Sequence, residues 1–113
     1  MKLLIVGSRS IVSFNLSVYI FAGVDTILSG GAAGVDSIAE RYADEHKLSK
    51  YIIRPRYDLY GRAAPIVRNK AMVEMCDRVL AIWDGTSKGT AATIEYAKKL
   101  NKEVCVVVPP NFP

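Results

Sequence analysis

Short apolar segments alternate with helix-like segments along the chain, and this alternation restricts the available folds more than any other feature. The apolar runs lie at residues 2–6, 26–28, 51–54, 78–83 and 103–108. Helical patterns occupy residues 11–22, a segment that begins at Val35, and residues 65–76 and 90–100. Strands that are almost continuously apolar are buried on both faces, which is typical of a parallel sheet between layers of helices. The sequence therefore predicts an α/β fold, a three-layer α/β/α Rossmann-like sandwich whose five-stranded parallel sheet has the order 3-2-1-4-5.

Length and composition narrow the class of protein further. The 113 residues, half of them apolar, suffice for one compact core, so we expect a single domain spanning residues 1–113. The formal charge of +4 is scattered along the chain, which suits an anionic ligand without requiring nucleic acid. The first apolar run ends at Gly7 and is too short for a signal peptide or a membrane span, so no membrane partner is expected. Cys76 and Cys105 lack metal-ligand spacing and lie in apolar stretches, so we expect buried, reduced thiols, a cytoplasmic location, and neither metal nor cofactor.

Two glycine-rich turns, at residues 29–34 and 84–90, each stand between a predicted strand and a predicted helix. Glycine lets the backbone approach a ligand and adopt positive φ, and the first amides of the next helix point outward with the positive end of its dipole. In the predicted strand order, the loops at residues 7–10, 29–36 and 84–90 meet at the switch point, where ligands bind in such sheets. The sequence therefore predicts a phosphate-bearing small molecule, a nucleotide or nucleotide derivative.

The candidate ligand-binding residues lie on these loops and on the helix before the fourth strand. They are Gly7, Ser8, Arg9, Gly30, Gly31, Gly34, Asp36, Arg68, Asn69, Asp84, Gly85, Ser87, Gly89 and Thr90. Arg9 and Arg68 would neutralise phosphate, the glycine amides and hydroxyl groups would donate to it, and Asp36 and Asn69 would select ribose or base. Asp36 has a structural alternative as a helix cap, and Arg68-Asn69 as a solvated helix face. Neither a GxGxxG fingerprint nor a P-loop motif is present.

Four segments, taken in order, resemble the SLOG superfamily. They are VGSRS at 6–10, LSGGAAGVDSIAERYA at 28–43, YGRAAPIVRNKAM at 60–72 and WDGTSKGTAATIEYAKK at 83–99. Within this superfamily, which includes the Smf/DprA DNA-processing proteins and the LOG phosphoribohydrolases, the chain is most similar to the small YspA/YpsA-related group. The resemblance covers nearly the whole chain and implies a Rossmann-like cleft, a nucleotide-derived ligand that is bound or sensed, and a homodimer.

The LOG resemblance is incomplete at one catalytic position. The LOG signature PGGxGTxxE supplies a glutamate, whereas residues 89–92 of this chain are followed by Thr93. Glu95 lies two residues further on, about 200° around the helix, and does not take its place. The arginine that these enzymes carry on the helix before strand four is matched by Arg68. Because hydrolysis of an N-glycosidic bond needs a group that stabilises positive charge or activates water, the sequence favours binding over hydrolysis.

Two alternative functions follow from the same segments. The first is a nucleoside-monophosphate phosphoribohydrolase whose carboxylate has moved to Asp36, Asp84 or Glu95. The second is binding of single-stranded DNA, since the SGGAAGVDSIA segment resembles the SGxAxGID pattern of the DNA-processing proteins. A basic groove with interleaved aromatic side chains would then come from Arg54, Arg56, Tyr57, Tyr60 and Arg62. We expect nucleic acid to be a less favoured partner than a small nucleotide, because these five residues come from one loop.

Overall fold

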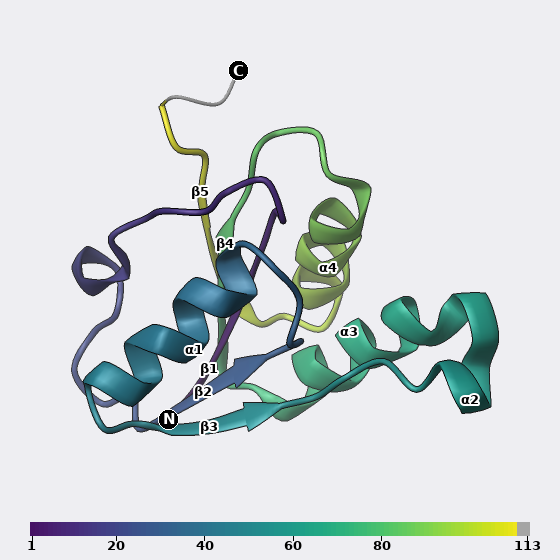
Figure 1. Cartoon of the computed structure of the whole chain (residues 1–113), viewed down its shortest axis with the longest axis horizontal. Helices are drawn as coiled ribbons and strands as arrows, with labels where there is room; N and C mark the ends of the chain where they lie inside the picture. Colours follow the sequence, from purple (N-terminus) through teal and green to yellow (C-terminus); the bar gives the residue numbers. More distant parts are fainter. Residues whose placement is uncertain (111–113) are drawn as a thin grey trace.

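A five-stranded parallel sheet forms the centre of the structure, a computed structural model that describes residues 1–110 (Figure 1). The strands are β1 (Lys2–Gly7), β2 (Thr26–Ser29), β3 (Ser49–Ile52), β4 (Arg78–Ile82) and β5 (Glu103–Val107). They are hydrogen-bonded in the order β3-β2-β1-β4-β5, and every neighbouring pair is parallel. The predicted fold class and strand order are therefore confirmed.

Helices cover both faces of the sheet (Figure 1). They are α1 (Val35–Glu45), α2 (Tyr57–Tyr60), α3 (Ala64–Met75) and α4 (Lys88–Lys99), with 3-10 turns η1 (Leu16–Val18) and η2 (Gly61–Ala63). Successive side chains of β1 point to opposite faces of the sheet and enter two core clusters. Leu3 and Ile5 pack with α1 on one face, whereas Leu4 and Val6 pack with α3 and α4 on the other. No helix of the described residues is both long and apolar enough to span a bilayer.

The predicted helix at residues 11–22 is wrong, since this segment contains only the three-residue turn η1. The Asn15 side chain accepts hydrogen bonds from the Ser17 amide (3.1 Å) and hydroxyl (2.5 Å). Such local side-chain bonds compete with helical ones, and the β-branched and aromatic residues around them lower helix propensity. The apolar pattern nevertheless marks burial correctly, because Ile11 and Leu16 lie in the core on the α1 side.

Cys105 is exposed, which corrects the prediction of two buried thiols; Cys76 is buried as expected. β5 is an edge strand, and α1 lies over the opposite half of the sheet, so no helix within residues 1–110 covers the α1-side face of β5 (Figure 1). Smaller boundary shifts affect β3, which ends at Ile52 rather than residue 54, and α4, which begins at Lys88 rather than residue 90.

Candidate functional site

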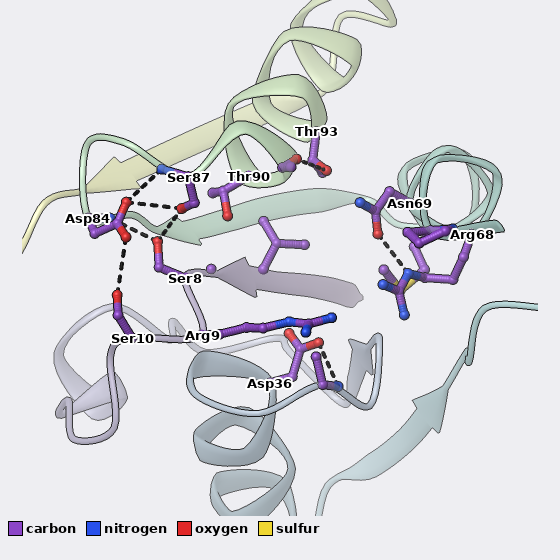
Figure 2. Close-up of a pocket in the computed structure, with 16 residues that line it drawn as sticks. Ser8, Arg9, Ser10, Asp36, Arg68, Asn69, Asp84, Ser87, Thr90 and Thr93 are labelled. Carbon is purple, nitrogen blue, oxygen red and sulfur yellow. Dashed lines mark hydrogen bonds between the residues drawn. The ribbon is translucent and has the colours of Figure 1, made fainter. Parts of the chain in front are cut away.

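A cavity of about 350 Å³ opens at the carboxyl ends of β1 and β4 (Figure 2). These strands are the two neighbours at the switch point, so the cavity lies at the position where the topology predicts a ligand site. Ten predicted residues line the cavity: Gly7, Ser8, Arg9, Asp36, Arg68, Asn69, Asp84, Ser87, Gly89 and Thr90. Six further residues complete the lining, namely Val6, Ser10, Ala32, Pro65, Met72 and Thr93.

Helical spacing could have revealed several of the additional lining residues. Pro65 and Met72 lie three residues before and four residues after Arg68, on the same face of α3. Thr93 follows Gly89 by one helical turn on α4. When one residue of a helix lines a cavity, residues three and four positions away are therefore expected to line it too. The predicted site did not include these neighbours.

Four predicted glycines support the loops instead of lining the cavity: Gly30, Gly31, Gly34 and Gly85. Gly34 has φ +73°, and a Cβ there would lie 2.5 Å from the Arg9 carbonyl oxygen and 2.6 Å from the Ser8 carbonyl oxygen. Gly85 has φ +86° in the turn after β4. A left-handed backbone explains Gly31, Gly34 and Gly85 without any ligand, and close packing against the Arg68 side chain explains Gly30.

Asp84 organises the loop between β4 and α4. Its Oδ1 accepts hydrogen bonds from the amides of Thr86 and Ser87, both at 2.8 Å, and from their hydroxyl groups at 3.2 and 3.0 Å. Its Oδ2 accepts one from the Ser10 hydroxyl at 3.1 Å. These donors, the two backbone amides first, lower the pKa of Asp84 well below its usual range and keep it ionised.

Ser8 connects the β1 loop to this network (Figure 2). It is 1% exposed, and its hydroxyl accepts from the Asp84 amide at 3.0 Å and lies 2.6 Å from the Ser87 hydroxyl. The predicted hydroxyl donors Ser8 and Ser87 thus already have protein partners. These hydrogen bonds connect the loop after β1 to the loop after β4 across the switch point.

Asp36 combines the two roles that the sequence left open. It lies in the first turn of α1, where its Oδ2 accepts a hydrogen bond from the Ala32 amide at 3.1 Å. It also lines the cavity, although the residue is only 7% exposed. Burial raises the pKa of the Asp36 carboxyl, and the Ala32 hydrogen bond and the nearby Arg68 charge oppose that shift only in part. Of the two carboxyl groups in the lining, Asp36 is therefore the one whose pKa is raised.

Arg68 is half-buried and does not form a solvated helix face. Its Nη1 donates to the backbone oxygens of Gly30 at 2.6 Å and Ile53 at 3.3 Å, and its Nε donates to Asn69 Oδ1 at 2.7 Å. Burial lowers the pKa of the Arg68 guanidinium, and the Asp36 charge opposes this. The side chain fastens α3 to the ends of two strands and leaves Nη2 without a hydrogen-bond partner among residues 1–110.

Arg9 and Thr90 face the cavity with groups that have no partner in the described part of the chain. Arg9 extends across the cavity in Figure 2, with neither a side-chain hydrogen bond nor an ion pair within residues 1–110. Thr90 is 7% exposed, and its hydroxyl points into the cavity without a hydrogen bond to any described residue. No buried side-chain polar atom of the described residues lacks a hydrogen-bond partner, so the Thr90 oxygen is accessible from the cavity and available to a ligand.

The three carboxylates considered for hydrolysis, Asp36, Asp84 and Glu95, differ in whether they line the cavity. Thr93 lines the cavity at the position of the LOG glutamate, and its hydroxyl donates to the Gly89 oxygen at 2.9 Å. Glu95 is exposed and lies outside the cavity lining, whereas Asp36 and Asp84 belong to it. Within residues 1–110, no group of three or more His, Cys, Asp or Glu side chains could hold a metal ion.

The arginines of the proposed DNA-binding loop are largely engaged within the protein. Arg54 donates to the Gly31 oxygen at 3.1 Å, and Arg56 binds Asp58 through two hydrogen bonds of 3.0 and 2.8 Å. The loop projects away from the sheet (Figure 1) and contributes nothing to the cavity lining. The structure therefore does not join these residues to the switch-point site.

The fold and the cavity define a Rossmann-like α/β protein with a cavity at its topological switch point, lined in large part by polar and charged side chains. The sequence matches no protein-family model, and no curated protein and no solved structure matches the chain.

Proposed function

We propose that the protein binds a nucleotide or nucleotide-derived phosphate ligand in the switch-point cavity, as the resemblance to the SLOG superfamily implies. The observation that carries the proposal is the Thr90 hydroxyl, which faces the cavity without a partner in the described chain, at the amino-terminal end of α4. The first turn of a helix presents free amides and the positive end of its dipole, and both favour an anion.

Two guanidinium groups reinforce this preference. Arg9 and Arg68 line the same cavity, and their like charges interact unfavourably, which contributes to the lowered pKa of Arg68. A bound phosphate would relieve that repulsion, because its oxygens accept hydrogen bonds from both. Of the two carboxyl groups in the lining, Asp84 is ionised and its charge is stabilised by the donors of its own loop, and the pKa of Asp36 is raised.

The size of the cavity supports a small molecule. Its volume of about 350 Å³ falls within the range of roughly 300–1,000 Å³ found for ligand sites. Gly89 lines the cavity, and a Cβ there would meet no heavy atom within 4 Å, so a ligand can approach this backbone closely.

Thermal unfolding with a ligand panel tests the proposal. The panel contains nucleoside mono-, di- and triphosphates, ADP-ribose, NAD, inorganic phosphate and a short single-stranded oligonucleotide. A ligand at one hundred times its Kd adds about 2.7 kcal/mol, or several degrees or more in Tm for a domain of this size. We expect a small nucleotide to produce this shift, and Arg9→Ala to abolish it.

Arg62→Ala is the matched control, because Arg62 is exposed and lies outside the cavity lining. It should preserve the shift produced by a nucleotide. A shift with the oligonucleotide alone, reduced by Arg62→Ala and by salt, would support single-stranded DNA binding instead. A flat panel would overturn phosphate-ligand binding altogether.

Asp36 favours hydrolysis as a second candidate function, since a cavity-lining carboxyl with a raised pKa can protonate a leaving base. If the protein is a phosphoribohydrolase, Asp36→Asn should abolish base release from a nucleoside monophosphate while nucleotide binding persists. Retained base release in this variant would exclude Asp36 as the acid. The homodimer is a proposal from the resemblance, and the cytoplasmic location is a proposal from the cysteine usage. Sedimentation of the purified protein tests the first.

A further inference from the structure

One end of the cavity consists of oxygen atoms whose protons are already committed to the protein. We call this the acceptor end; its residues are Ser8, Ser10, Asp84 and Ser87, which lie together in Figure 2. The group comes from two loops, one after β1 and one after β4. Its hydrogen bonds determine which ligand groups it can accept.

The ionised Asp84 fixes the direction of every hydroxyl proton at this end. Ser87 has one hydroxyl proton, which it donates to Asp84 Oδ1 at 3.0 Å. Ser8, 2.6 Å from Ser87, must therefore donate to the Ser87 oxygen, and it accepts from the Asp84 amide. The Ser10 hydroxyl donates to Asp84 Oδ2. Only lone pairs remain to face the cavity, so this end cannot donate hydrogen bonds to phosphate without losing its own.

The two oxygens of Asp84 differ in how fully they are used. Oδ1 accepts four hydrogen bonds from its own loop, whereas Oδ2 accepts a single one, from the partly exposed Ser10. A carboxylate oxygen has room for a further donor. Arg9, Thr90 and Gly89 provide the donors elsewhere in the cavity, so its polarity changes from one end to the other.

We propose that the acceptor end recognises hydroxyl groups of the ligand, with Asp84 Oδ2 as the principal acceptor, so that the ligand is a phosphorylated sugar that keeps its hydroxyl groups. In the nucleotide class this means a ribonucleotide instead of its deoxy forms. The inference rests on the proposed function, because the phosphate must occupy Thr90 and Arg9 for the sugar to extend toward Asp84. It also adds a specificity-determining role for Asp84 beyond its role within the loop.

Binding of AMP, GMP, CMP and UMP and of their 2′,3′-dideoxy counterparts tests the inference by calorimetry in the presence of EDTA. Removing both hydroxyl groups deprives a charged acceptor of its donors, so at least one dideoxy form should bind about tenfold more weakly than its ribonucleotide. Asp84→Asn should bring this ratio close to one. Thr86→Ala is the matched control: it removes a donor to Oδ1 only and lies outside the cavity lining, so it should preserve the ratio.

If Asp84→Asn fails to fold, Ser10→Ala keeps the inference falsifiable. It removes the one protein donor to Oδ2 and leaves the bonds to Oδ1 intact, so the preference for the ribonucleotide should persist or increase. A reduced preference in Ser10→Ala would overturn the inference, because it would show that Ser10 and not Asp84 contacts the sugar.

The remaining outcomes distinguish this inference from the proposed function. Equal binding of ribo and dideoxy forms would overturn the hydroxyl preference while leaving nucleotide binding intact. Binding that requires Mg²⁺ and is lost in EDTA would show that the acceptor end holds a cation, which also overturns it. If no phosphorylated probe binds, the proposed function fails and the inference fails with it.

Discussion

Replacing Gly34 with alanine should destabilise the protein by about 2–6 kcal/mol. The backbone at Gly34 has φ +73° and ψ −126°, a conformation that costs a residue with a Cβ roughly 1–3 kcal/mol. The new Cβ would also lie 2.5 Å from the Arg9 carbonyl oxygen, and forcing the β1 loop aside costs about a further 1–3 kcal/mol. The combined loss is a large share of the roughly 5–15 kcal/mol that holds a typical domain folded.

Urea unfolding, followed by the fluorescence of Trp83, the only tryptophan, measures this loss. Gly23→Ala is the matched control, because Gly23 also has positive φ, +101°, but a Cβ there would meet nothing within 4 Å. It should cost the conformational part alone, so Gly34→Ala should be the more destabilising by about 1–3 kcal/mol. If the unfolding free energies of both variants fall by the same amount to within about 0.5 kcal/mol, the close approach of Gly34 to the β1 loop contributes nothing to the loss, which contradicts the prediction.

Four further outcomes are expected. Arg68→Ala should lower the unfolding free energy by about 1–3 kcal/mol, because two backbone oxygens lose their donor, and urea denaturation checks this. Burial raises the folded pKa of Asp36 above 3.8, so protonated Asp36 contributes its full share of the unfolding free energy below that pH, and this share is lost as pH rises through the folded pKa. Asp36→Asn removes the titrating group, so its unfolding free energy should change less with pH over the acid range. Denaturation over a pH series would show this difference. Gly89→Ala should leave stability unchanged or raise it by up to about 1 kcal/mol while weakening nucleotide binding in the thermal-shift panel, since its Cβ enters open space in the cavity. A thiol reagent added to native protein should modify Cys105 rapidly and its buried counterpart only after unfolding, which mass spectrometry would resolve.

The fold follows from the sequence because it depends on patterns longer than any local preference. Five apolar runs and the helices between them leave few arrangements for a parallel sheet, and the structure has the predicted order. At residues 11–22 the apolar pattern predicted burial correctly but predicted a helix that the structure does not have. The Asn15 side chain binds the backbone locally, and periodicity alone does not weigh that competition.

The location of the cavity was predictable, whereas the contacts of its side chains were only partly so. Loop positions place Ser8, Asp84 and Ser87 at the switch point, but residue types alone do not reveal that the Ser87 hydroxyl donates to Asp84. The spacing of α3 likewise places Arg68 near the cavity without showing that its Nη1 is bound to two strand ends. Such roles depend on contacts between distant segments, which one sequence does not record.

The hydrogen bonds between the two loops of the acceptor end join residues that are 74 to 79 positions apart in the chain. A ribosome must therefore release most of the polypeptide before the serines after β1 meet Asp84. Until then those polar groups are solvated, and the ligand cavity has only part of its wall. Contacts so far apart in sequence form late, because the intervening chain must first be ordered. A nucleotide that needs the complete wall would consequently bind only chains whose last crossover has docked, and would protect finished molecules in preference to nascent ones.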